Sequence, residues 1–158
     1  MVPILFELWR KGPLAHSKLL DWLTFGYFNN AFKPVRTPKD WISSDHAVVD
    51  AYIADPFAGH PISNQFWFDW MHGLAEVHEP ESMAQIDSEL PIYLFSGGQD
   101  PVGKQGEYVV SLQKALKRAG SIDVTYKLYA NGRHEMINEP EKEQVFDDLL
   151  VWLRKRSQ

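Results

Sequence analysis

The sequence predicts an α/β protein, and two observations carry that prediction. Residues 90–95 (LPIYLF) form a continuous apolar run with turn-forming residues on both sides, as in a strand buried on both faces. Residues 123–129 form a second run, β-branched and aromatic, and the amphipathic residues 104–120 lie between the two. With a final helix over residues 138–156, this order is the building unit of a parallel sheet.

Helix boundaries follow from capping and stop residues. Apolar residues at helical spacing predict three helices in the first half, over residues 17–28, 43–56 and 62–77. Ser17 caps the first of these, and Ser63 or Asn64 caps the third. In the second half, Gly120 stops one helix, and Asn138 caps the last helix. Residues 29–41, with two prolines, predict a loop.

The composition of the chain excludes several functional classes. The chain has 158 residues, 44% of them hydrophobic, with a net charge of −5. It has no basic stripe, so we expect no nucleic-acid partner. The absence of cysteine excludes disulfides, thiolate zinc sites and a cysteine nucleophile together. No apolar run reaches the length of a transmembrane segment, and we expect a cytoplasmic protein without a cofactor.

The predicted sheet is too small to stand alone. Two parallel strands leave an apolar edge with unpaired N–H and C=O groups, and such an edge pairs with other strands. The second half therefore reads as the end of a larger sheet. We predict the boundary between the two halves near residues 79–90.

Polar side chains with catalytic potential follow both strands. Asp100 lies past the first strand, after the turn-forming Gly97 and Gly98, and His134 lies past the second. Reactive groups of parallel sheets lie at the carboxyl ends of the strands, so the two side chains should meet. A carboxylate bonded to imidazole fixes its tautomer and stabilises the imidazolium. The alternative is that Asp100 caps the helix that starts near Lys104 and that His134 is structural.

Three stretches together resemble the lysophospholipase and monoacylglycerol-lipase-like branch of the serine α/β-hydrolases. PIYLFSGGQDPVG (91–103) resembles the family's acid loop, and LYANGRHEMINE (128–139) its histidine loop. RTPKDWISSD (36–45), followed by VDAYIADPFAG, resembles its cap. The resemblance implies a partial α/β-hydrolase fold, with a helical cap over 1–85 and the last two parallel strands with their helices over 86–158.

The resemblance also implies roles and a substrate. Asp100 is the catalytic acid, His134 is the general base, and the substrate is a lipid-like carboxylic ester such as a lysophospholipid or monoacylglycerol. The family's G-x-S-x-G nucleophile motif is absent, and so is its oxyanion loop. We therefore predict that the chain alone is inactive. The alternative function is a non-catalytic module that self-associates through its open strand edge, by pairing or domain swapping.

Other residues are weaker candidates for a catalytic, metal-binding or substrate-binding role. Ser17 lacks the flanking glycines of a nucleophile elbow, and Ser96 reads as a strand-end residue that bonds backbone. HEMIN (134–138) lacks the second histidine of a zinc motif, so we expect no metal. The aromatic residues Phe66, Trp67 and Trp70 are either cap core or the wall of a substrate pocket.

Overall fold

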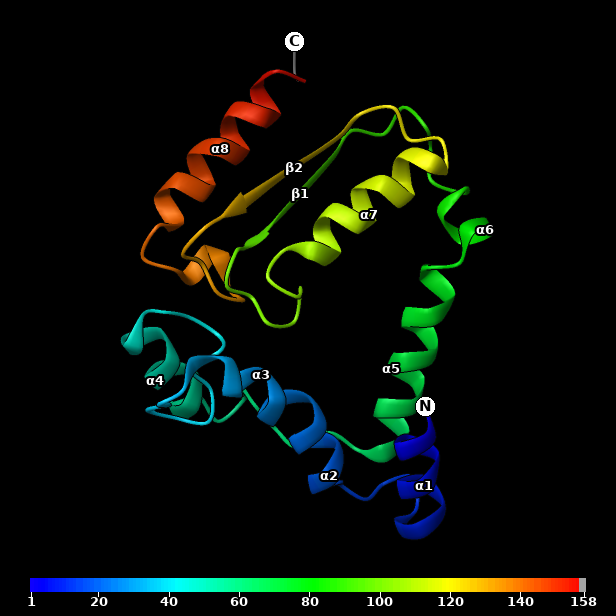
Figure 1. Cartoon of the computed structure of the whole chain (residues 1–158), viewed down its shortest axis with the longest axis vertical. Helices are drawn as coiled ribbons and strands as arrows, with labels where there is room; N and C mark the ends of the chain where they lie inside the picture. The colour runs from blue at the N-terminus through cyan, green and yellow to red at the C-terminus, as the bar shows by residue number, and fades with distance from the viewer. Residues whose placement is uncertain (157–158) are drawn as a thin grey trace.

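A computed structural model of the protein describes residues 1–156, and its centre is a short parallel sheet. Strands β1 (Ile92–Gly97) and β2 (Val124–Tyr129) pair in register from their first residues to their last. Helices α7 (Glu107–Arg118) and α8 (Lys142–Arg154) lie on either side of the sheet (Figure 1). This arrangement confirms the predicted partial α/β-hydrolase fold, with both faces of the sheet covered.

The contact between the sheet and α8 forms one of two small cores. Val145 of α8 is fully buried against Tyr129 and Met136, with Phe95 packed beside them. The Tyr129 hydroxyl donates to Asp148 Oδ2 at 2.9 Å, so a polar contact adds to the apolar one. This core fixes the carboxyl ends of both strands, where the loops begin.

The first half is helical, as predicted. Its helices are α1 (Val2–Lys11), α2 (Lys18–Asp21), α3 (Tyr27–Asn29), α4 (His46–Ala54), α5 (Asn64–Val77) and α6 (Pro80–Met83). A π-helical turn (Trp22–Gly26) joins α2 to α3, and 3-10 turns cover Asn30–Phe32 and Met136–Asn138. The predicted caps are confirmed, since Ser17 Oγ accepts from Leu20 N and Ser63 Oγ accepts from Phe66 N.

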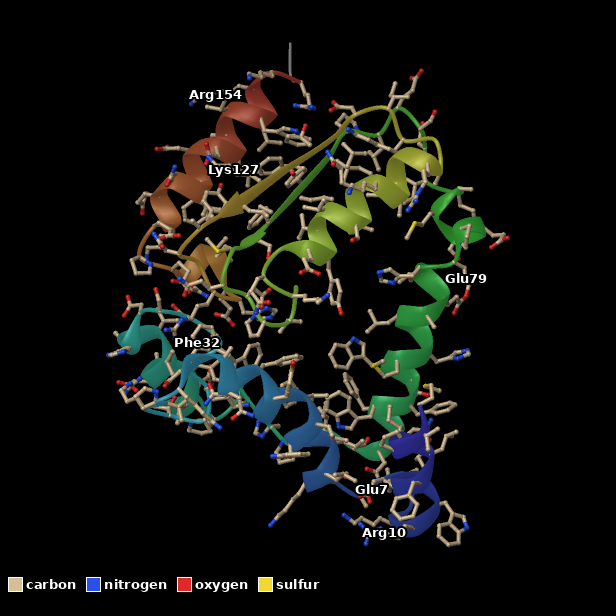
Figure 2. All side chains as sticks on the ribbon, in the orientation of Figure 1. Glu7, Arg10, Phe32, Glu79, Lys127 and Arg154 are labelled. Atoms are coloured by element: carbon tan, nitrogen blue, oxygen red, sulfur yellow. The ribbon has the colours of Figure 1, made fainter. Side chains whose placement is uncertain are left out.

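A second core holds the first-half helices together. Ile4 of α1, Leu20 of α2 and Trp67 of α5 are buried against one another. Glu7 is buried beside them and binds Arg10 and Lys11 at 2.7 and 2.9 Å. This charged cluster lies at the end of the molecule farthest from the sheet (Figure 2). Helix α1 is not predicted from the sequence, because the buried Glu7 interrupts its apolar periodicity.

The start of the last helix is predicted wrongly. Asn138 does not cap it, because α8 begins at Lys142. Pro140 disfavours helical dihedrals in the preceding Glu139, whose ψ of 160° is extended. The Glu139 side chain is buried elsewhere, in contact with Ser44. Among residues 1–156, every helix is too short or too polar to cross a lipid bilayer.

Candidate active site

The loops that follow the two strands are bonded backbone to backbone. Gly98 N donates to Tyr129 O at 2.6 Å, and Gln99 N donates to Gly132 O at 2.9 Å. A Cβ on Gly97 would lie 2.1 Å from the carbonyl oxygens of both Gly132 and Arg133. Gly97 is therefore required for this close approach, rather than for the turn dihedrals that the sequence suggested.

Asp100 is held from both its backbone and its side chain. Its N–H donates to Gly97 O at 3.2 Å, its carbonyl accepts from Gln105 N at 2.8 Å, and its Oδ1 accepts from Val102 N at 2.9 Å. The residue is 6% exposed. Helix α7 starts only at Glu107, after Gly106 in the left-handed conformation. Asp100 is thus not the cap of that helix.

Asp100 and His134 are in contact, 34 residues apart in sequence. His134 Nδ1 lies 3.2 Å from each carboxylate oxygen of Asp100. The carboxylate is buried, whereas the imidazole side chain is 38% exposed. A tautomer that donates from Nδ1 to Asp100 leaves Nε2 to accept a proton from another group. The two side chains therefore have the arrangement of an acid–base pair.

The pair opens onto a cavity of about 520 Å³. Its wall includes Ser96, whose hydroxyl contacts the carbonyl of Gly97 at 3.4 Å, as expected of a strand-end residue. A Cβ on Gly103 would lie 3.3 Å from Asp100 Oδ2 and 3.4 Å from Ser96 Oγ. The absence of a side chain at Gly103 thus keeps the space around the carboxylate free.

Residues 40–43 are hydrogen-bonded to the histidine loop (residues 128–139) on both sides of His134. Arg133 Nη1 donates to the carbonyls of Asp40 and Ser43, the latter at 3.1 Å. Glu135 N donates to Ile42 O at 2.9 Å. These bonds hold residues 40–43 against the loop that carries His134.

Aromatic contacts strengthen the same junction. The ring of Trp41 lies 5.0 Å from that of His134, at 48°. The Arg133 guanidinium lies over the Phe32 ring at 4.0 Å, and Phe32 marks the junction in Figure 2. Sequence reasoning missed Trp41 and the role of Arg133, since these contacts join segments about 90 residues apart.

A buried carboxylate completes the junction. Glu139 is 1% exposed. It accepts hydrogen bonds from Ser44 N at 2.9 Å, from the Ser44 hydroxyl and from Arg133 N at 3.3 Å. Since a buried polar group is costly without partners, these bonds favour one position of Ser44 against the histidine loop.

The aromatic residues proposed for substrate binding divide between core and cavity. Trp67 is 1% exposed and belongs to the first-half core, while Phe66 and Trp70 are half exposed. Phe25 stands between Trp67 and Trp41, with ring centroids at 5.6 and 5.9 Å. The structure therefore places these residues near His134 only through intervening rings.

Two further cavities lie along these rings. One, of about 580 Å³, is lined by Phe66 and Trp70 among others. The other, of about 770 Å³, has mainly apolar walls that include Trp67 and Trp70, and it reaches the acid loop at Val102. Among residues 1–156, no group of three or more His, Asp or Glu side chains is arranged to hold a metal ion.

Comparisons with known proteins show which protein family the chain belongs to. Residues 6–141 match the family model of the serine aminopeptidases, S33. A monoacylglycerol lipase of Mycolicibacterium smegmatis is 31% identical over 114 residues, which are 72% of this chain and 38% of that protein. The fold and the matched length identify an α/β-hydrolase. The chain belongs to the serine aminopeptidase S33 family.

Solved structures agree with this assignment. A thermostable carboxyl esterase from Bacillus coagulans, in complex with glycerol, superposes with a TM-score of 0.85 at 26% identity. A lipase in its open form superposes with a TM-score of 0.79 at 27% identity. Each match covers 98% of this chain, but 51% of the esterase and 50% of the lipase. The chain thus spans about half the length of these proteins.

Proposed function

We propose that the chain is the acid-and-histidine half of a serine hydrolase of carboxylic esters. One observation carries the proposal: His134 Nδ1 lies 3.2 Å from both oxygens of the buried Asp100, at the carboxyl edge of a parallel sheet. This is the position of reactive groups in such sheets. The family assignment supports the same reading.

In this mechanism His134 is the general base and Asp100 orients it. The carboxylate holds the Nδ1–H tautomer, so that Nε2 removes the proton from a serine hydroxyl as the hydroxyl attacks the ester carbonyl. The imidazolium, stabilised by Asp100, then donates that proton to the leaving alcohol. No G-x-S-x-G motif occurs in the sequence, so the serine and the oxyanion donors come from outside these 158 residues.

The proposed substrate is a lipid-like ester such as a monoacylglycerol or lysophospholipid. Supporting this class, the relatives include a monoacylglycerol lipase, an esterase and a lipase. The aromatic cavities beside Phe66, Trp67 and Trp70 are suited to an acyl chain. We likewise propose the division into a cap over residues 1–85 and a core over 86–158.

The proposed hydrolase function can be tested by joining the chain to an upstream half that contains a nucleophilic serine. We expect the chain, joined to the upstream half of the Bacillus coagulans esterase, to hydrolyse nitrophenyl butyrate, and the 158-residue chain alone not to do so. In the joined protein, His134→Ala and Asp100→Asn should each lower kcat by about 10⁴-fold. His78→Ala, at an exposed histidine that directly follows α5, should leave kcat unchanged. Unaltered kcat in His134→Ala would exclude the proposed base.

A second candidate is a self-associating module without catalysis. It rests on the sheet, where β1 and β2 each have one edge without a strand partner within residues 1–156. Light scattering tests it: this candidate predicts a dimer or larger species, and a folded monomer at all concentrations would count against it.

A further inference from the structure

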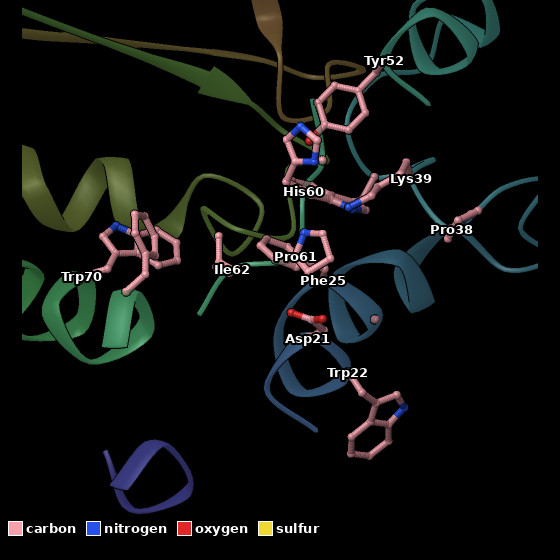
Figure 3. A pocket seen from close by; sticks show the side chains of 14 residues that line it. Asp21, Trp22, Phe25, Pro38, Lys39, Tyr52, His60, Pro61, Ile62 and Trp70 are labelled. Atoms are coloured by element: carbon pink, nitrogen blue, oxygen red, sulfur yellow. The ribbon is translucent and has the colours of Figure 1, made fainter. Parts of the chain in front are cut away.

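The cavity of about 580 Å³ contains a charge that the proposed catalysis does not use. Its walls include the rings of Trp22, Phe25 and Tyr52, together with Lys39 (Figure 3). Trp41 also lines it and contacts His134 as well, so this indole lies between the cavity and the candidate catalytic pair.

Lys39 lies within an aromatic surround. Its Nζ is 5.0 Å from the centre of the Phe25 ring and 5.8 Å from that of Tyr52. The side chain is half-buried, and burial lowers the pKa of Lys39, while the charge of Asp21 opposes that shift. A partly desolvated ammonium is stabilised by any anion that reaches it.

The ammonium of Lys39 has no ion-pair partner among residues 1–156. Other lysines do: Lys104 binds Glu107 at 2.6 Å, and Lys11 binds Glu7 at 2.9 Å. The nearby Asp21 is beyond ion-pair distance of Lys39. A donor of charge-assisted hydrogen bonds is therefore available at the cavity wall.

The other residues of the cavity favour an anion over a cation. His60 lines the same cavity and adds a second nitrogen donor. Among the described residues that line the cavity, Asp21 is the one carboxylate, against the nitrogen donors of Lys39 and His60. A ligand cation would also meet Lys39 itself on the faces of Phe25 and Tyr52.

An apolar route leads away from Lys39. Phe25 and Trp70 line both this cavity and the larger, mainly apolar one of about 770 Å³. The larger cavity continues past Met71 and Leu74 of α5 to Tyr108 of α7. A ligand with an anionic head and an apolar chain matches the order of these surfaces.

We propose that Lys39 binds the anionic head of an amphiphile whose chain lies along Phe25 and Trp70 into the larger cavity. A long-chain carboxylate is the simplest member of this class, and an alkyl phosphate has the same head charge. Because the same two cavities are proposed above for the acyl chain of the substrate, this inference rests on the proposed function and adds Lys39 as the contact for an anionic head group. Its test measures binding and does not require hydrolysis.

Calorimetric titration of the 158-residue chain with decanoate tests the proposal. We expect saturable binding of decanoate, with quenching or enhancement of tryptophan fluorescence because Trp22, Trp41 and Trp70 line the cavity. Decyl maltoside, with the same chain and a neutral head, should bind at least about tenfold more weakly, as expected for loss of a charge-assisted contact. Decyl phosphate, run in parallel, shows whether carboxylate or phosphate is the preferred head.

Variants locate the head group. Lys39→Met keeps the apolar stem and should weaken decanoate binding at least about tenfold. Lys39→Arg should retain binding, and Lys114→Met, an exposed lysine on α7, should match the wild type. Equal binding of decanoate by Lys39→Met, equal binding of decyl maltoside by the wild type, or no binding of decanoate would overturn the proposal. Binding of decyltrimethylammonium in preference to decanoate would also overturn it.

Discussion

Both halves of the molecule bury some apolar residues and expose others, but the most exposed aromatic side chains lie in the first half. In the sheet half, Val145 of α8 is fully buried, and the loops after both strands are bonded to each other. In the first half, Trp9 is 83% exposed and Phe66 is 51% exposed, although both belong to amphipathic helices. Helical periodicity thus identifies an apolar face, but it does not tell whether that face meets a core, a cavity or another chain.

The largest difference in stability should be found between a buried and an exposed tryptophan of the first half. Trp67→Ala removes a side chain that is 1% exposed and packed against Ile4 and Leu20, and should cost about 3–5 kcal/mol. Trp9→Ala removes an exposed indole and should change stability by less than about 0.5 kcal/mol. Urea denaturation followed by circular dichroism measures both. Equal losses in the two variants would contradict the comparison.

An intermediate difference in stability should be found between alanine substitutions at a glycine of the sheet half and at a glycine of the first half. Gly97→Ala places a Cβ 2.1 Å from two backbone carbonyls and should cost about 1–3 kcal/mol or more. Gly73→Ala, in α5 with no atom within 4 Å of the new Cβ, should stabilise by about 0.5–1 kcal/mol. The same denaturation experiment compares them. A neutral Gly97→Ala would mean that the loops do not approach as described.

The smallest expected effect is a loss of stability at low pH, and it should come from Glu7 in the first half. Hydrogen bonds from Ser17, Lys11 and Arg10 lower the pKa of Glu7 to about 2. Because the folded pKa lies below that of the unfolded chain, Glu7 stabilises the fold above pH 4.5. That contribution is lost as the pH falls from about 4.5 toward 2.

Glu7→Gln should therefore be less stable than the wild type near neutral pH and approach it as the pH falls. Thermal melts across the acid range check this convergence. A constant difference between the two proteins at every pH would show that the Glu7 charge does not contribute.

Prediction from sequence succeeded where the cause is local. The presence of both strands and the caps Ser17 and Ser63 follow from neighbouring residues, and the structure has them, although β1 lies two residues later than the predicted run of 90–95. The order of Asp100 and His134 past successive strands was enough to predict their meeting, because parallel strands end at one edge. Their catalytic roles, and those of Phe66, Trp67 and Trp70, stay predictions.

Prediction failed where the cause lies far along the chain. The buried Glu139, bonded to Ser44 across 95 residues, accompanies the late start of α8. The contact of Trp41 with His134 and the aromatic rings around the half-buried Lys39 arise from packing between segments that are distant in sequence. Such contacts leave no periodicity or spacing in the sequence.

The most direct test of the central claim is to label the 158-residue chain with a fluorophosphonate and read its intact mass. We predict no adduct, because the proposed function places the nucleophilic serine outside these residues. An adduct on one serine of this chain, mapped by peptide analysis and abolished by His134→Ala, would contradict it. That serine would then be the nucleophile, and the chain would contain a complete triad.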